Sequence, residues 1–339
     1  MSRQARWLDL GELDAAALHG AYAGLAEAQA PDAPPLLVWA RCREPHLCLG
    51  ASQGLSAEID AQACRAEQVP VLRRPLGGGT VWVDHDQCCV FMIWPKHVAP
   101  ARHGELFERA LAPMRAVFHA YGLAAERVGV SDLWLGERKL LGSGAATLGG
   151  SMVFGSSFLL DFPVARFARL MRAPSETYRA WLAEELARGM TTWSAHAPAP
   201  AASDLAQCLR TEVERALGWT SVSDQPTAAE RIAMQEAAAE AVEDLEQGAA
   251  LVENGIKINH HSYLIETRDA AGALRLVLRH GRIARLACEP RAAEVERAAL
   301  ACVPEHERLV AAMASLGAAA DGWARRIAGA AAGVRRVYG

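Results

Sequence analysis

Two glycine-rich segments of this chain have residue types suited to binding an anionic substrate. The first, RRPLGGGTVW at residues 73–82, places three consecutive glycines after two arginines. Glycines let a backbone approach a ligand closely, and the N–H groups of such a loop can form a nest for phosphate or carboxylate. Arg74 would add charge-assisted hydrogen bonds. We therefore expect an anion-binding loop here; the alternative is a flexible hairpin turn.

The second segment, GERKLLGSG at residues 136–144, carries a lysine between glycines. Of the 35 basic residues only three are lysines: Lys96, Lys139 and Lys257. Lysine is a compact point charge, whereas arginine is a planar fork. The Lys139 ammonium could bind a carboxylate and neutralise charge on a phosphate during transfer. The alternative is a solvated lysine on a hairpin.

Several common site types are excluded by the motifs. The chain has no G-x-x-x-x-G-K-[ST] loop, and no G-x-G-x-x-G follows a strand, so a common ATPase loop and a dinucleotide-binding fold are not expected. The eight cysteines lack the paired spacing of zinc sites, so we expect reduced, mostly buried thiols. No residue is assigned as a metal ligand.

Composition points to an ordinary soluble protein. The 339 residues are 51% hydrophobic and 22% charged, which is enough for two domains. The net charge of −4 gives no basic field for nucleic acid or membrane surfaces. No apolar run approaches the roughly 20 residues that span a bilayer, and the N-terminus lacks a signal-peptide core. We therefore expect a cytoplasmic protein that binds neither nucleic acid nor membrane.

The elements around these segments predict an α+β fold. Strands occur in groups with helices between the groups, rather than in βαβ alternation. Expected strands are 36–40, 47–49, 69–72, 80–83, 88–94 and 152–161, with a hairpin of 132–135 and 139–141. Expected helices are 13–26, 57–68, 106–121, 163–172, 175–188 and 204–217.

A change of composition after Trp219 predicts a second domain. Residues 226–246 read as a long, acidic, solvated helix, and they are followed by strands at 257–267, 274–279 and 283–287 and by alanine-rich helices. This gives domains of residues 1–225 and 226–339. His260 and His261 would lie in a strand, pointing to opposite faces, and so could not chelate one ion together.

Three stretches together resemble the lipoate–protein ligase family of the biotin/lipoate protein ligase superfamily. They are RRPLGGGTVW, the Gln53 turn of LGASQ, and SDLWLGERKLLGSGAATLGGSMVFGSSFLLD. The resemblance covers residues 35–195 and, more weakly, the tail, which looks like a fused accessory domain. It implies a catalytic fold shared with biotin ligases and class II aminoacyl-tRNA synthetases, a mixed sheet flanked by helices, with a small α+β C-terminal domain.

The resemblance also implies ATP-dependent protein lipoylation by a monomer. Lipoate or octanoate would attack the α-phosphate of ATP, with Mg²⁺, to give an acyl-adenylate and pyrophosphate. A lysine amine of a lipoyl-domain protein would then take the acyl group. The acceptor would be H-protein-like, a lipoate-binding protein or a dehydrogenase E2.

Site residues follow from the resemblance by matching positions. Lys139 would be catalytic, contacting both carboxylate and α-phosphate. Nucleotide contacts would come from Arg74, Gly79, Thr80, Val81, Trp82, Asp132 and Lys139. Acid contacts would come from Arg73, Gly77, Gly78, Lys139, Gly142, Ser143, Gly144 and Gly155.

Departures from the family pattern indicate a divergent member and leave alternatives open. Val83-Asp84 replaces the usual His-Asp, Ser131 an Asn, and Phe154 the His before Gly155. A sister group transfers octanoyl from acyl carrier protein through a cysteine, but neither 124–131 nor 145–146 contains one. A non-catalytic binder of lipoyl domains is the other alternative.

Overall fold

A computed structural model describes residues 3–335 and divides them into two compact units. The first holds residues up to 56, 61–163 and 191–248; the second holds 57–60, 164–190 and those from 249 onward. The division does not coincide with the predicted boundary between residues 225 and 226. It assigns the helix after this boundary to the first unit, because that helix packs on the first helix of the chain.

An eight-stranded mixed sheet forms the first unit. Its order is β11 (Trp219–Ser223), β1 (Arg3–Leu13), β2 (Leu36–Cys42), β6 (Gln87–Pro95), β10 (Ser151–Leu159), β9 (Arg138–Leu148), β8 (Asp132–Leu135) and β7 (Glu126–Val128). β1 pairs in parallel with β11 and β2, and the other neighbours are antiparallel. Strands β1, β7 and β11 were missing from the sequence prediction.

Helices cover both faces of this sheet. α4 (His103–Ala120) and α7 (Ala202–Leu217) contribute to one core, and α1 (Ala15–Ala28) contributes to the other. Alternate residues of β6 enter the two cores: Cys88, Val90 and Met92 the first, and Cys89, Phe91 and Ile93 the second. This explains why β6 reads as a continuous apolar run, as strands buried on both faces do.

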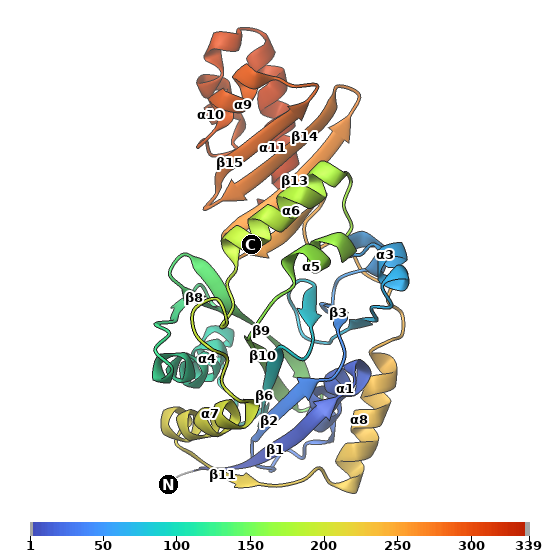
Figure 1. Cartoon of the computed structure of the whole chain (residues 1–339), viewed down its shortest axis with the longest axis vertical. Coiled ribbons are helices and arrows are strands. Elements are labelled where there is room, and N and C mark those ends of the chain that lie inside the picture. Colours follow the sequence, from blue (N-terminus) through green and yellow to red (C-terminus); the bar gives the residue numbers. More distant parts are fainter. Residues whose placement is uncertain (1–2, 336–339) are drawn as a thin grey trace. The chain divides into compact units, whose positions relative to one another are not determined.

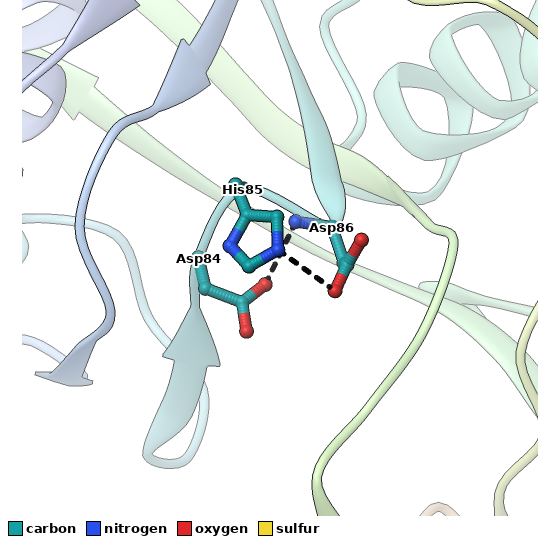
Figure 2. Close-up of side chains that lie close together, drawn as sticks. All are labelled: Asp84, His85 and Asp86. Carbon is teal, nitrogen blue, oxygen red and sulfur yellow. Dashed lines mark hydrogen bonds and ion pairs between the residues drawn. The ribbon is translucent and has the colours of Figure 1, made fainter.

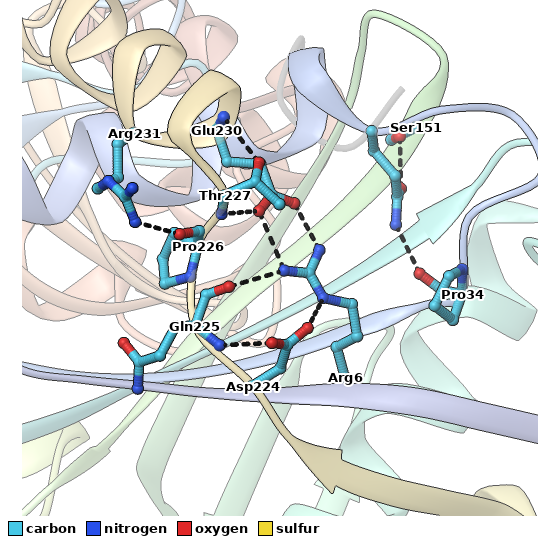
Figure 3. A network of polar contacts seen from close by, with 10 residues as sticks. Arg6, Pro34, Ser151, Asp224, Gln225, Pro226, Thr227, Glu230 and Arg231 are labelled. Atoms are coloured by element: carbon cyan, nitrogen blue, oxygen red, sulfur yellow. Dashed lines mark hydrogen bonds and ion pairs between the residues drawn. The ribbon is translucent and has the colours of Figure 1, made fainter.

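Helix α8 (Ala228–Glu240) lies beside α1 (Figure 1) and ends earlier than the helix expected over 226–246. Its acidic residues Glu236 and Glu240 are exposed, as expected for a solvated face, but Glu230 is buried. Two α1 glycines allow the close approach: a Cβ on Gly24 would lie 2.3 Å from the α8 backbone, and one on Gly20 2.5 Å. The helix begins with a capping box, and its Glu230 is 6% exposed. Although burial opposes it, hydrogen bonds from Arg6 and Thr227 lower the pKa of Glu230 (Figure 3).

A three-stranded sheet carries the glycine-rich loop. Its order is β4 (Val71–Arg73), β3 (His46–Leu49) and β5 (Val81–Val83). Along the chain, the short helices α2 (Leu55–Glu58) and α3 (Ala61–Ala66) lie between β3 and β4. β3 pairs in parallel with β4 and antiparallel with β5. Residues 74–80 therefore connect the two outer strands, and β3 is the strand that both of them pair with.

The second unit is a separate α+β body. Its antiparallel sheet has the order β12 (Gly255–Asn259), β13 (Ser262–Asp269), β14 (Gly272–Arg279) and β15 (Arg282–Glu289). Its helices are α5 (Val164–Leu170), α6 (Glu176–Gly189), α9 (Ala293–Ala299), α10 (His306–Ala312) and α11 (Ala319–Arg335), with a 3-10 turn at Ala314–Leu316. The α+β prediction is confirmed.

One detail of the tail differs from the prediction. His260 and His261 do not lie within a strand but form the turn between β12 and β13. Their ring centroids are 4.9 Å apart, so the alternation of a strand does not apply to them. Among the helices described in residues 3–335, none has the length and apolar character needed to cross a membrane.

The α1–α8 contact predicts opposite effects for two glycine-to-alanine changes. Gly24→Ala should destabilise the protein by about 1–3 kcal/mol, because the methyl group forces the helices apart. Gly104→Ala in α4 meets nothing within 4 Å and should be neutral or stabilise by up to about 1 kcal/mol, through helix propensity. Urea unfolding of both variants checks this; equal effects would show that the close packing is unimportant.

Candidate functional site

The predicted hairpin is present, and it presents Lys139 beside a buried carboxylate. Gly142 of β9 pairs with Asp132 of β8. The Lys139 Nζ lies 3.0 Å from Asp132 Oδ1, with the two side chains 22% and 6% exposed. A Cβ on Gly142 would lie 2.7 Å from that Nζ, so the lysine head occupies the space over Gly142. Only glycine at this position lets the ammonium lie flat on the strand and reach Asp132.

The backbone of Lys139 is held by a residue that the sequence did not single out. β8 and β9 shift register between Leu133 and Trp134, next to Lys139. The Lys139 carbonyl accepts a hydrogen bond from the Thr191 N–H at 2.8 Å. The Thr191 hydroxyl in turn lies 2.8 Å from His196 Nε2. Thr191, which is distant in sequence, thus fixes β9 where its pairing with β8 is irregular. No local sequence pattern predicts such a contact.

Glycines also form the surface on which the loop rests. Gly144 of β9 pairs with Gly155 of β10, so both lie on one face of the sheet. A Cβ on Gly155 would meet the Leu76 side chain at 2.5 Å, and one on Gly144 would lie 3.0 Å from the Gly77 carbonyl. The loop therefore packs directly against the strand that carries Lys139.

Arg74 shapes the loop from inside. Its side chain is buried, and its guanidinium donates to the carbonyls of Cys48 at 2.8 Å, Gly77 at 3.2 Å and Gly79 at 2.7 Å. Gly78 has a φ of +104°, a conformation that favours glycine. Arg74 thus bonds to the backbone of the loop and of β3, and its contact with a nucleotide remains a prediction.

The remaining predicted residues differ in their availability. Arg73 donates to the carbonyls of Leu245 and Gln247. Trp82 is buried, with its indole N–H on Asp84 at 2.6 Å. These two side chains are engaged within the protein, so direct ligand contact by them stays a prediction without geometric support.

Thr80, Val81 and Ser143 lie in more accessible places. The Thr80 hydroxyl donates to buried Gln53 at 3.2 Å, and Gln53 also accepts the Gly50 N–H, which confirms that the Gln53 turn is part of the loop region. Val81 is 38% exposed. The Ser143 hydroxyl donates to the Ser131 carbonyl at 2.6 Å. Their contacts with substrate remain predictions.

One cluster has the composition of a metal site. Asp84, His85 and Asp86 follow β5, and one ligand atom from each lies within 4.8 Å of the others (Figure 2). Asp84 Oδ2 already accepts the Trp82 indole N–H, and Oδ1 accepts the Asp86 N–H at 3.0 Å. The buried carboxylate thus organises its own turn, and the cluster is not assigned a metal.

The cysteines and the departures from the family pattern are explained by burial. Burial raises the pKa of Cys88 to about 11 and raises that of Cys89 further, which disfavours a thiolate. Phe154 packs against Phe107 of α4, with ring centroids 5.9 Å apart. It therefore belongs to the core on the opposite face from the loop, where an apolar residue fits.

Taken together, the arrangement can neutralise and position anions. A preorganised ammonium lies on β9, and a backbone loop held by a buried guanidinium packs against the same strand. Such fixed charges stabilise developing negative charge because they need no reorganisation during the reaction. The described residues around Lys139 show no activated thiolate, so the geometry favours electrostatic over covalent catalysis.

Comparisons with known proteins agree with this chemistry. A family model for the lipoyl protein ligase A/B catalytic domain matches residues 21–214. No curated protein gives a significant match to the sequence. Among solved structures, a bipartite lipoate protein ligase from Thermoplasma acidophilum, studied with its E2 lipoyl domain, is similar with a TM-score of 0.67 and 17% identity, covering 73% of this chain and 97% of that one.

Two further solved structures share the fold. Lipoate-protein ligase A bound with ATP has a TM-score of 0.59 and 17% identity, covering 70% of this chain and 95% of its own. LipL1 of P. falciparum in complex with lipoate has a TM-score of 0.57 and 13% identity, and it covers 96% of this chain and 98% of its own. Since the family model spans more than half of the residues, the chain belongs, as a divergent member, to the lipoyl protein ligase A/B family.

Proposed function

We propose that the protein is an ATP-dependent lipoate–protein ligase. It activates lipoate or octanoate as an acyl-adenylate and transfers the acyl group to a lysine of a lipoyl-domain protein. The observation that carries this proposal is the Lys139 ammonium, fixed 3.0 Å from Asp132 on the strand against which the glycine loop packs. Structural relatives bound to ATP and to lipoate, and one studied with its E2 lipoyl domain, support the choice of substrates and acceptor.

In the first step a carboxylate oxygen attacks the α-phosphorus of ATP, and the bond to pyrophosphate breaks. Lys139 contacts the carboxylate and the α-phosphate, reducing the repulsion between the two anions. The loop at residues 76–80 presents backbone N–H groups to the phosphates. Both reactants are thus held in place, which lowers the entropic part of the barrier.

In the second step the acceptor amine attacks the acyl carbon, the bond to AMP breaks, and the nitrogen loses a proton. AMP leaves with the oxygen that came from the acid. No protein nucleophile is needed, which agrees with the high pKa that burial gives Cys88 and Cys89.

Magnesium fits this site only together with the nucleotide. Asp132 is bonded to Lys139, and Asp84 is used by its own turn, so neither offers a free carboxylate group for a protein-held ion. Mg²⁺ commonly binds through nucleotide phosphates and waters. When bound, it neutralises phosphate charge, and no step is assigned to it here.

Removing the Lys139 ammonium should abolish activation. We expect Lys139→Ala to reduce acid-dependent ATP–pyrophosphate exchange by about 10²–10³-fold, the usual effect of deleting one preorganised charge. Lys96→Ala is the matched control, because Lys96 is exposed and lies outside the site. Near-normal exchange in Lys139→Ala, with lipoate and with octanoate, would contradict the assigned role.

Thiol reactivity separates the ligase from the cysteine-dependent transferase. Cys208 and Cys302 are half-buried and the other six cysteines are buried. We expect at most these two to react quickly with Ellman's reagent at pH 7.5, and all eight after unfolding in denaturant. Rapid labelling of Cys88 or Cys89 in the folded protein would favour acyl transfer through a thiolate instead.

The non-catalytic alternative makes a different prediction for the same experiments. A binder of lipoyl domains would give no exchange in wild type with either acid, while remaining folded. Lys139→Ala would not change this absence of exchange. Exchange in wild type would therefore exclude the binding protein, whereas its absence would leave the binding protein and the transferase, which thiol labelling separates.

A further inference from the structure

Beneath the glycine loop lies a pair of buried histidines that the proposed reaction does not use. His19 of α1 and His46 of β3 are 5% and 0% exposed, and their Nε2 atoms are 2.9 Å apart. At this distance one ring donates an N–H and the other accepts it with a lone pair. At least one ring must be neutral for this bond, because two protonated rings have no acceptor between them, and the burial of both rings favours the fully neutral pair.

The pair is connected to the loop through β3. His46 and Cys48 are on this strand, which pairs with both strands that flank the loop. His19 Nδ1 lies 3.8 Å from Cys48 Sγ. The Cys48 carbonyl accepts from Arg74 Nη1 at 2.8 Å, and Arg74 also donates to two loop carbonyls. The histidines therefore support the strand from which the loop is held.

The surroundings of the pair contain no carboxylate that bonds to either ring among the described residues. On its α1 side His19 Nδ1 lies 3.4 Å from the Tyr22 hydroxyl. His46 Nδ1 lies 3.5 Å from Cys42 Sγ and 3.3 Å from the Glu44 carbonyl. The Glu44 carboxylate accepts instead from the Ala15 N–H.

Electrostatics opposes a positive charge here. Burial lowers the pKa of His46 to about 4, and burial, then His46, then Arg74 lower the pKa of His19 well below its usual value. Asp14, Glu44 and Asp84 act electrostatically on Cys42, and Cys89 acts on Tyr22, whereas the cation that acts on His19 is the Arg74 guanidinium.

We propose that His19 and His46 form a proton-sensitive support of the glycine loop. While both rings are neutral, their hydrogen bond holds β3 and Arg74 in place. When either ring takes up a proton and becomes an imidazolium, a second buried cation forms near Arg74. The loop then loosens. The two histidines are positioning residues for the loop; the consequence for ATP binding rests on the proposed function.

The direction of the pH dependence follows from the lowered pKa values. An exposed histidine titrates near pH 6.5, whereas the folded pair resists protonation. The closed arrangement, in which the neutral pair holds β3 and Arg74 in place, is therefore fully favoured above about pH 6.5. It is lost as the pH falls toward 4. Across that window the equilibrium between closed and loosened loop shifts by up to about tenfold per pH unit for each histidine.

NMR titration of the wild-type protein tests the proposal directly. The amide signals of Gly77, Gly78 and Gly79 and the imidazole nitrogens of His19 and His46 are followed from pH 7.5 to 3.5, a range that includes the lowered pKa of His46. We expect the glycine amides to shift with the midpoint of the imidazoles, while β6 amides keep their positions. Different midpoints, or loss of the β6 signals over the same range, would overturn a loop-specific role.

Non-titrating variants sharpen the test. His19→Gln and His46→Gln each keep a hydrogen-bonding group and remove one titrating ring, so the glycine amides should shift less in each variant and should no longer shift in the double variant. His97→Gln is the matched control, since His97 is exposed, and it should titrate as wild type does. An unchanged glycine titration in both Gln variants would refute the proposal; should they fail to fold, the wild-type midpoints still decide it.

Exchange kinetics connect the loop to activity. In wild type the KM for ATP should rise on the order of fivefold or more between pH 7 and pH 5, and clearly less in His46→Gln, with a smaller change in kcat. A KM profile that is the same in both would remove the link between the pair and nucleotide binding. Absence of exchange at every pH would refute the proposed function and leave the NMR result on the loop standing.

Discussion

The site depends on backbone surfaces that carry no Cβ atoms. Gly142 leaves room for the Lys139 head, and Gly144 and Gly155 leave room for the loop. Any larger residue would have to displace the lysine or lift the loop from the sheet. Because these three glycines share one face of β9 and β10, the ammonium and the loop lie over the same surface, and the opposite sheet face is free to be an apolar core.

Arg74 and Lys139, two cations with different chemistry, have different roles at this surface. Arg74 has a planar fork with several donors, and it bonds to three carbonyls within the protein. Lys139 has one compact charge, held by one carboxylate and 22% exposed. The arginine therefore sets the shape of the loop and the lysine remains available to a ligand. This explains why a chain that otherwise uses arginine has a lysine at this position.

Local patterns were enough to predict much of the fold and the hairpin that carries Lys139. Continuous apolar runs gave β6, and the glycine turn at Gly136 gave the hairpin that carries Lys139. Strand β1 was missed because its burial comes from neighbours at both sides of the sheet. The packing of α8 on α1 was not predicted because it depends on glycines distant in sequence.

Contacts over long sequence separations explain the other differences. The bond from Thr191 to Lys139 and the approach of His19 to His46 join segments that no periodicity relates. The sequence also suggested ligand contacts for Arg73, whose Nη2 donates to the carbonyls of Leu245 and Gln247. Residue type thus identified which charges matter, while their partners followed only from the tertiary structure.

The central claim is that the acid is activated by direct attack on the α-phosphate of ATP. Its most direct test uses octanoate or lipoate labelled with ¹⁸O in the carboxylate, together with ATP and a lipoyl domain. We expect that the domain is acylated and that one labelled oxygen appears in the AMP released. Acylation that proceeds from acyl carrier protein without ATP, or that yields unlabelled AMP, would contradict it.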